Sequence, residues 1–281
     1  MDSGKLTTSY YGFGGKEDLG GGLAAQFRIE GFFQADTGTE GRFTGDATWA
    51  RTSSVGLSHA DYGSLNFGRN STQLFISTLS FNALGDSFGY SPSIRHYFSS
   101  STVTGDTGWN DSIFYSSPAF GGFRFGVATA LETGSASTDG ENWGLNLGYA
   151  SGPLSAALVY QDVKKDSAIA AVDNTTTTQL NGAYDFGVAK AYLQYGTVEN
   201  DTTGNEFDIV GAGVRVPFGA GAAVAQYGQI DAKNTADRKT FTAGYIHALS
   251  KRSELYAVYM KDKVDGLSSG RAYAVGVRHK F

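Results

Sequence analysis

Arg271-Ala-Tyr-Ala-Val-Gly-Val-Arg-His-Lys-Phe281, the stretch with which the chain ends, changes character from one residue to the next. One parity is apolar or aromatic: Tyr273, Val275, Val277, His279 and Phe281. The other is small or charged: Ala272, Ala274, Gly276, Arg278 and Lys280. Because side chains alternate across a β-strand, this pattern predicts a strand with one apolar face. A second sheet covers such a face in a soluble sandwich, whereas lipid covers it in a membrane barrel, whose polar face lines a lumen.

The composition of the 281-residue chain suits strands rather than membrane helices. Hydrophobic residues make up 41%, the mean hydropathy is −0.23, and no run approaches the roughly 20 apolar residues of a transmembrane helix. The 39 Gly, 16 Tyr and 19 Phe suit aromatic strand faces joined by glycine turns. The absence of Cys excludes disulfides and thiolate metal sites, and a net charge of −5 spread along the chain excludes a basic nucleic-acid footprint.

Alternating segments recur along the chain and predict an all-β fold of 15 strands. They lie near residues 7–17, 23–33, 47–59, 64–70, 109–117, 123–133, 140–150, 153–163, 175–185, 188–198, 205–216, 221–231, 238–248, 253–263 and 271–281. Phe241 and Tyr245 oppose Thr240 and Thr242 in one clear example, whereas segment 188–198 is mixed on both faces.

The connections between these segments fall into two alternating classes. Short turns occupy residues 118–122, 151–153, 185–187, 217–220 and 249–252. Longer polar loops occupy residues 134–139, 164–174, 199–204, 232–237 and 264–269. Short turns at one end and long loops at the other are typical of an antiparallel transmembrane β-barrel, which also leaves no open sheet edge in lipid. A soluble sandwich leaves this arrangement unexplained.

Residues 72–108 interrupt the alternation and form the longest segment without it. Long irregular loops are uncommon and usually functional, so this segment is a candidate functional loop.

The beginning of the chain shows no signal peptide, because Met1-Asp-Ser-Gly-Lys-Leu-Thr-Thr8 lacks a basic segment followed by an apolar core. Single-chain bacterial barrels usually have an even number of strands. Both observations favour a 16-strand protein whose signal and first strand precede Met1, which would then lie in the first long loop. The alternative is a further strand hidden within the chain, for example within 72–108.

Several motifs resemble the general trimeric porins of Gram-negative bacteria, in particular those of β-proteobacteria. They include Tyr11-Gly-Phe-Gly-Gly-Lys-Glu-Asp-Leu-Gly-Gly-Gly-Leu23, Leu65-Asn-Phe-Gly-Arg69, Ser112-Ile-Phe-Tyr-Ser-Ser-Pro-Ala-Phe-Gly-Gly-Phe123, Gly244-Tyr-Ile-His-Ala-Leu-Ser-Lys-Arg-Ser253 and Gly276-Val-Arg-His-Lys-Phe281. They span nearly the whole chain. Three parts of them are specific when found together in this order: the turn Glu17-Asp-Leu-Gly-Gly-Gly22, the turn Leu249-Ser-Lys-Arg252 and the terminal Arg278-His-Lys-Phe281. The resemblance implies a single barrel domain over 1–281, a homotrimer in the outer membrane, and 72–108 folded into the lumen as a constriction. It also implies that the outer-membrane assembly machinery reads Phe281.

A channel of this kind needs a wet lumen with charges that create a transverse field, and no cofactor or metal. The candidate acidic residue is Asp86 on the inserted loop, and the basic candidates are Arg28, Arg51 and Arg69. Arg28 points inward by parity. Arg51 matches a wall arginine of the family but shares the parity of Val55, so it needs a bulge or a position above the lipid. Each of the four could equally be an ordinary wall or rim charge.

The sequence also departs from the anion-selective relatives. The resemblance leads us to expect Arg near positions 10 and 108, where this chain has Tyr10 and Gly108. A less basic lumen predicts weak selectivity with a lean toward cations.

Three readings of the function compete. The first is a passive diffusion channel for small hydrophilic solutes and ions. The second is a barrel enzyme, for which no assembled nucleophile, acid or base is visible. The third is a substrate-specific channel or adhesin. Very long outer loops would favour it, but most of the loops in this sequence are short. The four histidines lie far apart in sequence without the spacing of metal ligands: His59, His96, His247 and His279.

Overall fold

The computed structural model describes residues 1–131, 141–164 and 174–281. In these ranges, fifteen strands form one sheet in which each strand pairs with its neighbours in sequence. The strands are β1 Tyr10–Gly20, β2 Leu23–Phe32, β3 Thr52–His59, β4 Gly63–Ser71, β5 Gly108–Ser116, β6 Phe123–Ala130, β7 Asn142–Ser151, β8 Leu154–Val163, β9 Thr175–Asp185, β10 Lys190–Asn200, β11 Asn205–Phe218, β12 Gly221–Ala232, β13 Arg238–Ala248, β14 Ser253–Val264 and β15 Gly270–His279. All the pairs are antiparallel, as the alternation predicts.

Two predicted strands differ from the structure by three residues or more at a described boundary. The first strand runs over Tyr10–Gly20 rather than 7–17, and its turn closes on Gly21 and Gly22, both with positive φ. The strand predicted for 47–59 begins at Thr52. Ala50 N donates to Ala47 O at 3.1 Å, so a turn replaces the start of that strand. The predicted strand ends at residues 132, 133 and 140, and the loops at 134–139 and 165–173, lie outside the described residues.

The segment expected to be irregular contains two helices, α1 (Gln73–Ser80) and α2 (Pro92–Phe98). It therefore supplies no strand of the kind that the alternative strand count requires. The described ranges contain these two helices, and neither is long and apolar enough to cross a membrane.

The two faces of the sheet are inverted relative to a soluble protein. On the apolar face, Tyr273, Val275 and Val277 are 77%, 84% and 66% exposed. On the polar face, Thr177 and Gln179 are fully buried. The predicted apolar face of the last strand is thus uncovered, which contradicts the sandwich alternative and is expected of a sheet whose outer solvent is lipid.

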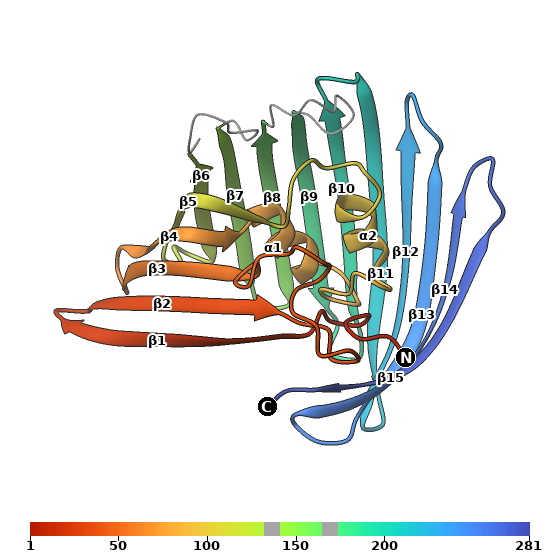
Figure 1. Ribbon diagram of the computed structural model, residues 1–281, viewed down its shortest axis with the longest axis horizontal. Coiled ribbons are helices and arrows are strands. Elements are labelled where there is room, and N and C mark those ends of the chain that lie inside the picture. The colour runs from red at the N-terminus through yellow and green to blue at the C-terminus, as the bar shows by residue number, and fades with distance from the viewer. Residues whose placement is uncertain (132–140, 165–173) are drawn as a thin grey trace.

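The sheet curves around the two helices, α1 and α2 (Figure 1). The red and orange strands β1–β4 lie on one side of α1 and α2, and the blue strands β12–β15 lie on the other (Figure 1). The largest fully buried side chains include Tyr97, Leu74 and Ile94 of these helices, so the densest packing lies inside the curve rather than between two sheets.

Candidate functional site at the inserted segment

Residues 72–107, here called the inserted segment, leave and rejoin the sheet at one point. Thr72 N donates to Thr107 O at 2.8 Å, which closes the segment at its base. Thr72 also caps α1, because its Oγ1 accepts a hydrogen bond from Phe75 N at 3.1 Å. Ser91 caps α2 in the same way through Ile94 N at 3.3 Å, and Pro92 occupies the first turn, where a missing N–H costs nothing.

Buried amides on the polar face of the sheet bind α1. Gln179 Nε2 donates to Thr78 Oγ1 at 2.8 Å, and Asn181 Nδ2 donates to Ser77 Oγ at 2.9 Å. Gln194 Nε2 donates to Thr78 O at 3.1 Å. Because a buried polar group is costly without a partner, these amides specify where the helix sits.

The same arrangement fixes the region of α2. Gln226 Nε2 donates to Ser93 Oγ at 2.7 Å, and its Oε1 accepts a hydrogen bond from Ala83 N at 3.1 Å. Thr242 Oγ1 donates to Tyr90 O at 2.7 Å. The helix approaches β12 so closely that a Cβ at Gly228 would lie 2.8 Å from the His96 ring.

Apolar packing accompanies these hydrogen bonds. Leu74 and Tyr97 of the inserted segment join one buried cluster with side chains from the strands. The strand members are Val159, Val198, Phe207, Ile209 and Ile230. The polar face is therefore mixed where it carries the helices, which explains why both faces of segment 188–198 look mixed in the sequence.

The other side of the inserted segment contacts the N-terminal coil. Lys5 O accepts hydrogen bonds from Ser87 Oγ at 2.8 Å and Gly89 N at 3.1 Å. Thr7 Oγ1 donates to Asp86 Oδ1 at 2.9 Å and accepts from Arg278 Nη1 at 3.0 Å. The coil thus ties the predicted acidic residue to the last strand.

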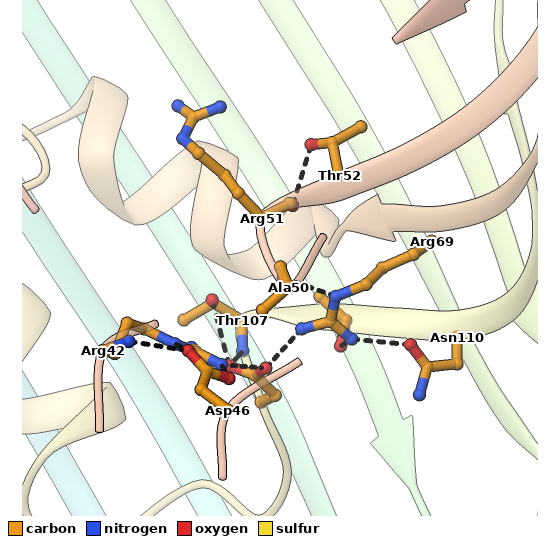
Figure 2. Close-up of polar contacts among 10 residues, drawn as sticks. Arg42, Asp46, Ala50, Arg51, Thr52, Arg69, Thr107 and Asn110 are labelled. Atoms are coloured by element: carbon orange, nitrogen blue, oxygen red, sulfur yellow. Dashed lines mark hydrogen bonds and ion pairs between the residues drawn. The ribbon is translucent and has the colours of Figure 1, made fainter. Parts of the chain in front are cut away.

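A cluster of charges lies at the base of the inserted segment. The Arg42 guanidinium pairs with Asp46 at 2.8 Å and with Asp106 at 2.9 Å, and Arg69 pairs with Asp106 and donates to Asn110 Oδ1 at 2.8 Å (Figure 2). Burial alone would raise the pKa of Asp106, but the hydrogen bond from Arg42 and the charges of both arginines lower it to about 2. Arg69 is therefore neutralised locally by a carboxylate. A Cβ at Gly108 would lie 3.5 Å from the Arg69 guanidinium carbon, in ordinary van der Waals contact with it.

Arg51 points away from this cluster (Figure 2). It pairs with Glu30, and its guanidinium carbon lies 3.9 Å from the centre of the Tyr10 ring. Because β3 begins only at Thr52, Arg51 is not bound by the alternation of that strand, which resolves its conflict with the parity of Val55. Arg28 lies 3.9 Å from Glu30, with 65% of its side chain exposed.

A third group of charges joins α2 to the sheet. Arg95 pairs with Asp262 at 3.2 Å, and Arg238 Nε donates to Asp262 Oδ1 at 3.0 Å. His96 is fully buried beside them, with Nε2 2.8 Å from Thr240 Oγ1. Burial, together with the charges of Arg238 and Arg95, lowers the pKa of His96 to about 3, so the ring is neutral at physiological pH.

A cavity of about 380 Å³ lies among the N-terminal coil, the segment after β2 and the inserted segment. Its charged lining residues are Lys5, Arg42, Arg51, Asp86 and Arg95. The structure thus brings the predicted residues Arg51 and Asp86 together at one cavity, whereas Arg28 and Arg69 do not line it. Sequence reasoning missed Lys5, Arg42 and Arg95, because none of them lies in an alternating segment. A cap signature, Ser91-Pro92, was the available signal for the helix that carries Arg95.

The comparisons with known proteins agree with this architecture. A family model described as Gram-negative porin matches residues 1–267. Outer membrane porin protein 32 of Delftia acidovorans is 34% identical over 292 residues, covering 97% of this chain and 80% of that protein. A second outer membrane porin protein, from Bordetella pertussis, is 28% identical over 335 residues, covering 100% of this chain and 84% of that protein.

A solved structure gives the same result. The anion-selective porin from Comamonas acidovorans superposes with a TM-score of 0.82 at 28% identity, covering 98% of this chain and 90% of that one. The sheet is therefore that of an antiparallel transmembrane β-barrel of the outer membrane, and its apolar face is the lipid-facing one. The chain belongs to the Gram-negative porin family, and it is similar to the β-proteobacterial members.

Proposed function

We propose that this porin is a passive diffusion channel for small hydrophilic solutes and ions, with the inserted segment narrowing its lumen. The observation that carries the proposal is the row of buried amides and hydroxyls that binds α1 and α2 to the polar face. A polar face is what an aqueous lumen needs, and a segment anchored to it by several hydrogen bonds is a fixed obstruction rather than a mobile loop.

The charges around the cavity support a transverse field. In this proposal, Asp86 supplies the acidic side, and Arg51 supplies the basic side together with the exposed Arg28. Arg69 acts less directly, by holding Asp106 in place.

Weak selectivity follows from the pairing of these arginines. Arg42 has Asp46 and Asp106 as partners, Arg51 has Glu30, and Arg95 has Asp262. A paired guanidinium contributes little net potential to the passage, because the carboxylate cancels most of its field beyond a few ångströms. The channel should therefore differ from the relative described as anion-selective, with a slight lean toward cations.

The assembly is part of the same proposal. We infer a homotrimer in the outer membrane, in line with the family. Phe281 is fully exposed at the end of the chain and contacts the His279 ring with centroids 4.6 Å apart. An exposed terminal aromatic is available for recognition by the machinery that inserts outer-membrane barrels.

Reconstitution into planar bilayers tests the proposal. We expect discrete conductance steps at every salt concentration. In a tenfold KCl gradient we expect a small zero-current potential whose sign indicates a preference for cations. An ideally selective channel would reach roughly 59 mV in the same gradient. A folded, inserted protein without conductance contradicts the channel, whereas a large potential on the anion side contradicts only the charge argument.

A further inference from the structure

One carboxylate at the cavity lacks the ion pair that the arginines there have. Arg42, Arg51 and Arg95 each pair with a carboxylate. Asp86 lines the same cavity, and among the residues that the structure describes no cation pairs with it. Lys5, the remaining charged residue of the lining, is exposed and carries its ammonium on a flexible stem. The field of Asp86 is therefore not cancelled by a guanidinium, and its strength in the passage depends on where the carboxylate points.

A neutral hydroxyl holds this carboxylate instead. Thr7 Oγ1 lies between two charged groups, 2.9 Å from Asp86 Oδ1 and 3.0 Å from Arg278 Nη1. A guanidinium can only donate, so the hydroxyl accepts from Arg278, and its single hydrogen is free to be donated to the carboxylate. Hydrogen bonds in such a chain polarise one another, which strengthens the hydroxyl as a donor. Arg278 is itself paired with Glu254 on the neighbouring strand, so the sheet fixes the direction of both bonds.

The N-terminal coil also holds the backbone that carries Asp86. Lys5 O accepts hydrogen bonds from Ser87 Oγ at 2.8 Å and from Gly89 N at 3.1 Å. The two segments approach so closely that a Cβ at Gly89 would lie 2.5 Å from Lys5 O. Leu6, between these contacts and Thr7, is only 3% exposed. The coil therefore presents the Thr7 hydroxyl from a fixed position, one buried residue away from the backbone contact.

Holding the carboxylate in one place matters for a narrow passage. The Asp86 side chain has two rotatable bonds, so without a partner its carboxylate would divide its time among several rotamers. The Coulomb potential of a single charge falls with distance and is largest where little water intervenes. In a charged constriction such differences in potential decide how readily cations and anions enter. A single hydrogen bond to the carboxylate can therefore change which ions pass.

We propose that Thr7 is a positioning residue for ion selectivity, which holds the Asp86 carboxylate in the orientation that gives the channel its lean toward cations. The inference rests on the proposed function, in which Asp86 supplies the acidic side of the transverse field. Thr7 carries no charge and contributes no field of its own, so it acts only through the carboxylate that it binds. Arg278 contributes by orienting the hydroxyl, and the rest of the coil contributes by holding the threonine in place.

Zero-current potentials in a KCl gradient test this, with single-channel conductance recorded for every variant to show that it folds and inserts. Asp86→Asn removes the charge and should move the potential toward anions. Thr7→Val and Thr7→Ala remove the hydroxyl and should both move it in the same direction, by part of that shift. Thr7→Ser restores the hydroxyl and should return the wild-type potential. Thr8→Val is the matched control, because the Thr8 hydroxyl lies at the same cavity and bonds to no other described residue. It should leave the potential unchanged.

The double variant Thr7→Val with Asp86→Asn separates positioning from any other effect of the threonine. Because Thr7 acts through the carboxylate, its removal should shift the potential no further once the charge is gone. A Thr7→Val channel with the wild-type potential, a shift that persists in the double variant, or an equal shift in Thr8→Val would overturn this inference and leave the proposed channel standing. An Asp86→Asn channel with the wild-type potential would overturn both this inference and the acidic role that the proposed function gives to Asp86.

Discussion

Gln179 Nε2 donates a hydrogen bond to Thr78 Oγ1 at 2.8 Å, and both side chains are fully buried. The two residues are 101 positions apart, one on β9 and one on α1. This contact shows how the molecule uses the polar face of its sheet: alternate residues that would face water in a bare strand bind the inserted segment.

Replacing Gln179 by Leu should destabilise the folded protein by about 1–3 kcal/mol, because it removes one buried hydrogen bond from the Thr78 hydroxyl and one from the Asn181 amide, which keep only Leu74 O and Ser77 Oγ as partners. Thermal unfolding in detergent, followed by circular dichroism, measures the change. Thr178→Ala, one residue away on the exposed face, should unfold close to the wild-type temperature. Equal losses in the two variants would mean that the contact does not hold the segment.

Close approach of α2 to the sheet makes one glycine critical. A Cβ at Gly228 would lie 2.8 Å from the His96 ring and 2.9 Å from Pro92 Cβ, whereas a Cβ at Gly182 would meet nothing within 4 Å. Gly228→Ala should therefore cost about 1–3 kcal/mol through overpacking and displace α2, while Gly182→Ala should be close to neutral. Unfolding midpoints and single-channel conductance distinguish the two. A Gly228→Ala variant with wild-type values of both would show that the helix is not seated as described.

Much of the fold could be predicted from the sequence, because lipid and water on opposite sides of a sheet force a two-residue alternation. The strand predicted for residues 253–263 and the observed β14 agree within one residue at each end. The helices could not be found in this way. α1 spans only Gln73–Ser80, and α2 only Pro92–Phe98, so neither repeats its pattern long enough to separate it from a loop.

The charges of the site were harder still. Arg42 contacts Asp106 across 64 positions, and Arg95 contacts Asp262 across 167. Both arginines belong to segments without periodicity, so only their folded positions show that they share a cavity with Asp86. Arg51 and Asp86 could be proposed because the resemblance supplied a place for each, not because spacing brought them together.

Removing one carboxylate should change the ionic preference of the channel. Asp106→Asn leaves Arg42 and Arg69 without their shared partner, so the potential at the base of the inserted segment becomes more positive. The zero-current potential in a KCl gradient should shift toward anions. Asp208→Asn removes the same charge from the lipid-facing side and should leave that potential unchanged. If the Asp106→Asn channel kept the wild-type ion preference, this cluster of charges would not lie along the permeation path.

The buried His96 predicts a pH dependence of stability. Its pKa is lowered to about 3 by burial and by the charges of Arg238 and Arg95, with Asp262 opposing them. The unfolded chain takes up this proton near pH 6.5, so the free energy of unfolding should fall as the pH drops from about 6.5 to about 3. His96→Asn removes this contribution, and its unfolding free energy should depend less steeply on pH in that window, by up to about 1.4 kcal/mol per pH unit. Identical slopes for the two proteins would contradict the burial of a neutral ring.

Chemical modification of single cysteines, in a chain that has none of its own, tests the central claim most directly. Asp86→Cys places a thiol at the cavity beside the inserted segment, and Val275→Cys places one on the lipid-facing side of β15. Both channels are recorded in planar bilayers before and after treatment with a bulky methanethiosulfonate, with labelling confirmed by mass spectrometry. The account predicts that the label lowers the conductance of Asp86→Cys and leaves that of Val275→Cys unchanged. A fully labelled Asp86→Cys channel that conducts as before would contradict the claim that ions pass through a lumen narrowed by the inserted segment.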